Sequence, residues 1–223
     1  FISIPSKKVL FIYLTDESSF SSNVIGSATP SLKTIKLNDK YYTDASANQI
    51  SYLNDMPVLF NTNVLIHEVL HMLGFSSEIN TFIKGTVGGS DTRYDGTNGV
   101  AGYKQLLNAN YLTITTNSNS NLQTATSGVS DFNHIQVVPL EDDGGSGTQI
   151  YHWEDITSVP DPREFDGKRH PILKNEIMTG VISTGIHPGY EYLTTMTTGL
   201  FKDIGYTIND NSKWVVTSGT NMS

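Results

Sequence analysis

The feature that most constrains this chain is a pentapeptide inside an apolar run, at residues 67–71, which read His-Glu-Val-Leu-His (an HExxH motif). An α-helix turns once in about 3.6 residues, so His67 and His71 would lie on one face, about 6 Å apart. The flanking residues are mostly apolar, as is typical of a helix buried on most sides. Two histidines and a glutamate buried there would be costly without a partner, which a metal ion supplies. The motif therefore predicts two metal ligands, with Glu68 placed to act as a base beside them.

The limits of this helix are also predicted from the sequence. Asn61 or Thr62 could serve as the N-cap, because their side chains can accept a hydrogen bond from the first turn. The last helical residue is expected to be Leu73. Gly74 would then end the helix in a left-handed conformation, which glycine adopts without steric cost.

Composition excludes several classes of function. The chain has 223 residues, which suits one large domain or two small lobes around a cleft. Its net charge of -8 argues against a nucleic-acid partner, and no apolar run approaches the roughly 20 residues that span a bilayer. Because the chain has no cysteine, a transition-metal site must use His, Asp or Glu. The chain starts at Phe1 without a signal-like segment, so we expect a processed product.

Apolar periodicity and turn residues predict the other elements. The predicted strands are a buried strand at 9–14, a strand at 32–37 at a sheet edge with its lysines outward, a hairpin within 79–98 closed by Asp95-Gly96, and a strand at 134–138 whose ladder pairing ends at Pro139. Helices are predicted at 100–110 and at 192–203, the last ending before Gly205. Residues 45–54 fit a helix or a strand, and a helix is favoured. Residues 117–130 are expected to form a polar connector.

A catalytic zinc site needs three protein ligands and one open position, so one ligand is still missing. The candidates are the acids and the four other histidines, namely His134, His152, His170 and His187. In the commonest extended motif the third histidine comes six residues after the second, but here that residue is Ser77. Spacing alone therefore leaves the third ligand open.

Four landmarks in order carry a family resemblance. Residues 67–76 read His-Glu-Val-Leu-His-Met-Leu-Gly-Phe-Ser, and residues 151–154 read Tyr-His-Trp-Glu. Residues 175–180 read Asn-Glu-Ile-Met-Thr-Gly, and residues 195–206 follow as an amphipathic segment. Together they resemble the signature of the leishmanolysin-type metzincin peptidases over about residues 61–206. The absence of cysteine departs from the disulfide-rich eukaryotic members of that family.

This resemblance implies a site and a fold. His152 would be the third zinc ligand, with His187 as its main competitor, and Met178 would form the Met-turn, an apolar floor under the histidines. The fold would be an α+β metzincin, with a twisted mixed sheet and the motif helix in an upper lobe at about 1–76. An insertion at about 77–148 would precede a lower lobe at about 149–223, with the Met-turn and the C-terminal helix.

The resemblance also implies an activity, that of a secreted or cell-surface zinc endopeptidase acting on proteins or peptides. Glu68 would take a proton from the zinc-bound water and deliver it to the leaving amine. The strand at Leu32–Leu37 is the candidate for pairing with the substrate backbone, and Tyr190 or Tyr192 could stabilise the oxyanion. We expect a monomer, made with an inhibitory pro-segment that is removed before Phe1.

Three alternatives stay open. Asp91, in Asp-Thr-Arg-Tyr, faintly resembles the third ligand of the aspzincin peptidases. A non-catalytic surface-binding module could keep the metal site as a relic, although such a module has no need for Glu68. Calcium could bind oxygen ligands, for which the candidates are Asp91, Asp95, Asn98 and the cluster Glu141-Asp142-Asp143.

Overall fold

The computed structural model describes residues 10–15, 20, 24–39, 56–85, 92–108, 136–142, 148–154, 163–165, 168–170, 176–180 and 192–209. The chain divides into two compact units, Phe1–Leu73 and Gly74–Ser223, each described by itself below. The predicted limits of the lobes and the insertion stay predictions. The predicted helix at 45–54 and the connector at 117–130 lie outside the described residues.

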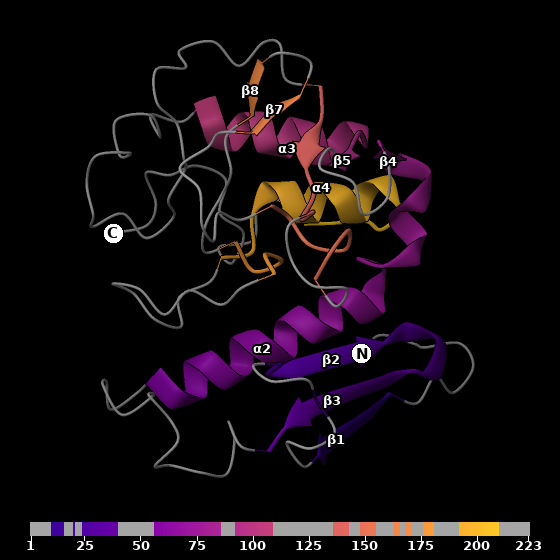
Figure 1. The fold of residues 1–223 in the computed structure, drawn as a ribbon, viewed down its shortest axis with the longest axis vertical. Helices are drawn as coiled ribbons and strands as arrows, with labels where there is room; N and C mark the ends of the chain where they lie inside the picture. Colours follow the sequence, from indigo (N-terminus) through magenta and orange to yellow (C-terminus); the bar gives the residue numbers. More distant parts are fainter. Residues whose placement is uncertain are drawn as a thin grey trace. The chain divides into compact units, whose positions relative to one another are not determined.

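A three-stranded mixed sheet forms the core of the first unit (Figure 1). Its strands are β1 (Phe11–Thr15), β2 (Gly26–Thr29) and β3 (Thr34–Asn38), in the order β1-β3-β2. β3 runs parallel to β1 and antiparallel to β2, so the prediction of an edge strand at 32–37 was wrong. The alternation along β3 is as expected, because Ile35 and Leu37 are buried and Lys36 is exposed. A short 3-10 turn, η2 (Pro30–Leu32), joins β2 to β3.

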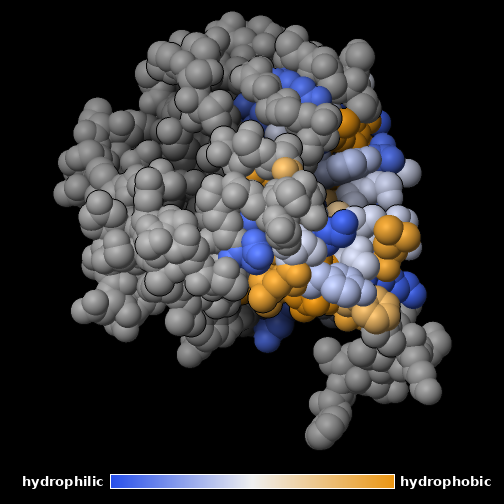
Figure 2. Space-filling view, turned by 60° about the horizontal axis from the view of Figure 1, so that its bottom comes forward, coloured by the Kyte–Doolittle hydropathy of each residue, from blue (hydrophilic) through white to orange (hydrophobic). Residues whose placement is uncertain are grey.

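Strand β1 occupies the position at the sheet edge. The predicted strand exists, but its burial was predicted wrongly, since Leu10 to Leu14 are each at least 40% exposed. A strand made of an apolar run is buried only when other elements cover both of its faces. The periodicity of the sequence does not show whether such elements are present. Apolar surface is visible among the described residues in Figure 2.

Helix α2 (Met56–Leu73) carries the histidine motif and packs against β2 (Figure 1). It begins before the predicted N-caps, so Asn61 and Thr62 lie inside the helix and the prediction of its start was wrong. Pro57 is compatible with this earlier start, because a first-turn residue needs no N–H for the helix ladder. The end is as predicted, with Gly74 at a φ of 130°.

Two helices lie side by side in the second unit, α3 (Thr97–Asn108) and α4 (Thr195–Asp203) (Figure 1). Both were predicted, and α4 starts later than expected because Thr194 is its N-cap, accepting a hydrogen bond from Met196 N at 3.2 Å. The helices approach closely at two glycines. A Cβ on Gly102 would overlap the carbonyl of Thr195, and one on Gly199 would overlap the carbonyl of Asn98.

Asp203, at the end of α4, also holds the start of α3. Its carboxylate accepts hydrogen bonds from the backbone N–H groups of Asn98 and Gly99, both at 2.9 Å. It accepts a further bond from the Tyr94 hydroxyl at 2.8 Å. The side chain thus satisfies N-terminal donors of α3 that have no partner within the helix.

Short strands complete the described part of the second unit. A 3-10 turn, η4 (Ser77–Phe82), precedes an antiparallel sheet of β4 (Ile83–Lys84), β5 (Arg93–Tyr94) and β6 (Val138–Pro139). A second, two-stranded sheet consists of β7 (Arg163–Phe165) and β8 (Lys168–His170).

The predicted hairpin exists, but its turn was placed wrongly. Ile83 pairs with Tyr94, so the chain reverses between β4 and β5, and Asp95-Gly96 follows the hairpin. There the Gly96 carbonyl accepts a hydrogen bond from Val100 N, which starts α3. The expectation that Pro139 ends the pairing was also wrong, because Pro139 pairs with Arg93 and Leu140 N still donates to the Thr92 carbonyl.

Within the described part of the chain, no helix has the length and apolar character needed to cross a bilayer.

Candidate metal centre

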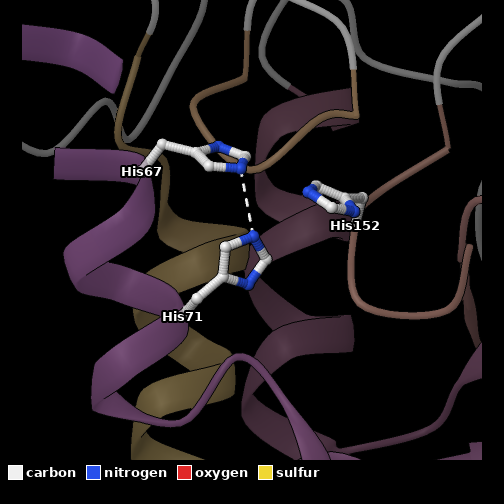
Figure 3. A group of neighbouring side chains, drawn as sticks. All are labelled: His67, His71 and His152. Carbon is white, nitrogen blue, oxygen red and sulfur yellow. Dashed lines mark hydrogen bonds between the residues drawn. The ribbon is translucent and has the colours of Figure 1, made fainter. Parts of the chain in front are cut away.

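His67 and His71 lie on one face of α2, as the spacing predicts. Their Nε2 atoms are 3.0 Å apart and share a hydrogen bond (Figure 3). The two rings meet edge to face, with centroids 4.7 Å apart. The helix therefore presents two imidazole nitrogens at one point.

His152 comes from the segment 148–154 and is buried. Its Nδ1 lies 2.6 Å from the Thr148 carbonyl oxygen. Because a carbonyl can only accept, Nδ1 carries the proton, which leaves the lone pair of Nε2 for a metal. Ile150 stands in this segment with a φ of 79°, a left-handed conformation that β-branched residues rarely adopt.

Ligand atoms of His67, His71 and His152 all lie within 4.8 Å of one another, and Figure 3 shows the three rings converging. This group could hold a metal ion. The donor chemistry fits zinc, because neutral imidazoles bind zinc at about 2.0–2.1 Å, which places two nitrogens on one tetrahedral ion about 3.3 Å apart. The separation of His67 and His71 is close to that value.

Of the other candidate histidines, His170 lies on the described strand β8. His134, His187 and Asp91 lie outside the described residues.

Glu68 follows His67 on α2 and is 5% exposed. Burial raises the pKa of its carboxyl group from 4.5 to about 8. Among the described residues, no hydrogen-bond partner reaches its Oε2. Its Oε1 faces Gly26 of β2, where an added Cβ would lie 2.8 Å away. A buried carboxyl group with a raised pKa is the expected property of a proton acceptor that works near neutral pH.

Met178 is fully buried in a tight turn at residues 176–179. Thr179 closes the turn by donating its backbone N–H and its hydroxyl to the Glu176 carbonyl, at 3.0 and 2.9 Å. The Met178 carbonyl accepts a hydrogen bond from Trp153 N at 2.9 Å. The assignment of this turn as a Met-turn stays a prediction.

The calcium prediction gains no support. Asp95 pairs with Lys84 at 3.3 Å, and the Asn98 side chain donates to Asp203 at 2.8 Å. Glu141 is buried and its backbone N–H donates to the His152 carbonyl. Of the described candidates, Asp95 and Asn98 are thus already engaged with other side chains of the protein.

Two residues next to the site were not found by sequence reasoning. Gly26 gives room to Glu68, and the Thr148 carbonyl orients His152. A single glycine between Ile25 and Ser27 carries no recognisable pattern, and a backbone carbonyl carries no sequence signal.

Most of the chain matches a known family. The family model for leishmanolysin, of the peptidase family M8, matches residues 42–222. No curated protein and no solved structure gave a significant match. The mixed architecture of small sheets and few helices is compatible with such a domain, and the family implies a zinc metalloprotease. Because the match spans most of the chain, the protein belongs to the leishmanolysin family of metallopeptidases.

Proposed function

We propose that this protein is a zinc endopeptidase in which His67, His71 and His152 hold the metal and Glu68 is the general base. The observation that carries the proposal is the convergence of three imidazoles beside a buried glutamate. Four titratable side chains at one place would be costly if they served packing alone. A place at the cell surface or outside the cell belongs to the same proposal on the ground of the family, and a monomeric state is part of the proposal too.

When bound, a zinc ion with three protein ligands supplies Lewis acidity and lowers the pKa of a water molecule toward about 7. Glu68 takes the proton of the attacking water on a carboxyl oxygen. It then delivers that proton to the nitrogen of the leaving amine. Burial raises the pKa of Glu68, whereas a cation held by the three histidines would favour the ionised form that takes the proton.

The substrate strand has to be reassigned from the sequence prediction. Leu32–Leu37 largely coincides with β3, which is bonded on both sides and cannot accept a substrate strand. β2 lies at the edge of the same sheet, and its Gly26 faces Glu68. An extended peptide added to the edge at β2 would run past the general base, so we assign substrate pairing to β2.

The test compares cleavage of casein and zinc content for the purified chain. The wild type should contain one zinc and lose activity with o-phenanthroline. Glu68→Ala should keep the zinc, and its rate of casein cleavage should fall by about 10²–10⁴-fold, the usual contribution of a general base. His152→Ala should lose zinc, whereas His170→Ala, as a control outside the site, should keep both zinc and activity.

Four outcomes would redirect the assignment. Cleavage by Glu68→Ala at the wild-type rate would refute the role of that residue. If His152→Ala retained zinc, the third ligand would be another residue, and His187 would be tested next. If Asp91→Ala lost zinc, the aspzincin alternative would be favoured. One zinc per chain without cleavage would favour a binding module.

A further inference from the structure

The carboxylate of Glu176 is buried in the second unit and bonded to several donors. The side chain is fully buried and accepts four hydrogen bonds. The donors are Met178 N at 2.6 Å, the Thr194 hydroxyl at 3.0 Å, Thr194 N at 3.4 Å and the Thr197 hydroxyl. One side chain thus joins the turn at 176–179 to the start of α4.

All four groups donate to Glu176, and such bonds favour the ionised form of its carboxyl group. Backbone N–H groups cannot accept a hydrogen bond, and both hydroxyls act as donors here. Burial opposes this form and raises the pKa of Glu176 to about 7, so the donors are needed to hold the charge.

The network continues from Glu176 to the residue that follows His152. The Thr197 hydroxyl accepts a hydrogen bond from Trp153 Nε1 at 2.8 Å, while it donates to Glu176. Trp153 N donates to the Met178 carbonyl at 2.9 Å. Both the indole and the backbone of Trp153 are therefore tied to groups that Glu176 orients.

A buried carboxylate is a costly way to stabilise a core, because apolar residues of similar volume often give equal or greater stability. Ionic and polar networks do, however, fix a single geometry, and metal ligands depend on such support. We propose that Glu176 is a positioning residue that, through Thr197 and Trp153, holds His152 in place as a metal ligand. The inference rests on the proposed zinc site and assigns no catalytic contact to Glu176.

The chain offers a matched pair of residues for the test. Thr197 and Thr198 are neighbouring buried threonines of α4, but the Thr198 hydroxyl donates to the Thr195 carbonyl, at 3.4 Å, and not to Glu176. Zinc affinity is measured by competition with a chelator, and the thermal midpoint is measured on the metal-free protein. Thr197→Val should weaken zinc binding about tenfold, at the low end of the effect of supporting residues around metal ligands. Thr198→Val should bind zinc as the wild type does, and Thr197→Ser, which keeps the hydroxyl, should restore the affinity.

Equal zinc affinities of Thr197→Val and Thr198→Val would overturn the positioning role while leaving the zinc site intact. A loss of affinity in both variants, in proportion to a lower thermal midpoint, would also overturn it, since that is the mark of a structural role alone. Glu176→Gln should weaken zinc binding at least as much as Thr197→Val, and wild-type affinity in this variant would contradict the proposal. A wild-type protein that binds no zinc would refute the proposed function itself.

Discussion

Gly26 of β2 lies against the carboxyl group of Glu68, so that a methyl group on its Cα would come within 2.8 Å of Oε1. The Val64 side chain lies 3.2 Å from the same point. The position of Glu68, the proposed general base, therefore depends on the absence of a side chain at Gly26.

Gly26→Ala should lower the rate of casein cleavage by up to about 10²-fold, because displacement of a reacting group by about 1 Å has effects of this size. Zinc content should not change, since the three atoms nearest to an added Cβ belong to Glu68 and Val64 and not to a histidine. Ser27→Ala is the control, because Ser27 pairs with the exposed Lys36 and points to the other face of the sheet. Full activity of Gly26→Ala would show that Glu68 does not need this space.

Ile150 provides a test of backbone strain beside His152. Ile150→Ala and Ile150→Gly both remove the aliphatic side chain, but only glycine adopts a φ of 79° freely. Urea unfolding should therefore show Ile150→Gly to be more stable than Ile150→Ala by about 1 kcal/mol. The opposite order, which is usual where φ is negative, would contradict the left-handed conformation.

Glu176 gives the metal-free protein a defined dependence of stability on pH. Its pKa in the folded state, about 7, lies above the ordinary value of 4.5, so the folded protein holds the proton more tightly between these values. Stability from this group is present below pH 4.5 and is lost as pH rises to 7, by about 3 kcal/mol in total. Denaturation of the wild type and of Glu176→Gln from pH 5 to 8 measures the difference. A difference that does not change with pH would contradict the raised pKa.

Asp203 should contribute measurably to stability through the start of α3. Asp203→Asn loses the charge and one acceptor, and should lower the free energy of unfolding by about 1–2 kcal/mol. Asp95→Asn is a suitable control, because its ion pair with Lys84 is largely exposed and such pairs contribute at most about 1 kcal/mol. Equal effects of the two substitutions would show that Asp203 does not act as a cap.

The meeting of the two histidines of the motif could be predicted, because residues four apart in the sequence are neighbours on the surface of a helix. His67 and His71 therefore meet through local geometry, and Gly74 marks the end of the helix for a local reason as well. His152 lies far along the chain, and only the resemblance selected it among four histidines. The structure brings it to the same place.

The arrangement of the sheet could not be predicted in the same way. The alternation along β3 correctly placed Lys36 outward, but alternation does not reveal how many neighbours a strand has. The apolar run in β1 suggested burial, whereas its exposure depends on what packs against it. Glu176 stood in a recognised segment, but its role depends on Thr194 and Thr197, which come from another element.

The close approach of α3 and α4 limits how this enzyme could be altered. At Gly102 and Gly199 the backbone of one helix occupies the space that a side chain would need on the other. A larger residue at either position would push α4 outward and carry Thr197 with it. In a library of variants selected for proteolysis, Gly102 and Gly199 should therefore remain unchanged. The exposed positions Ala101 and Gln105 of α3 should accept many residues.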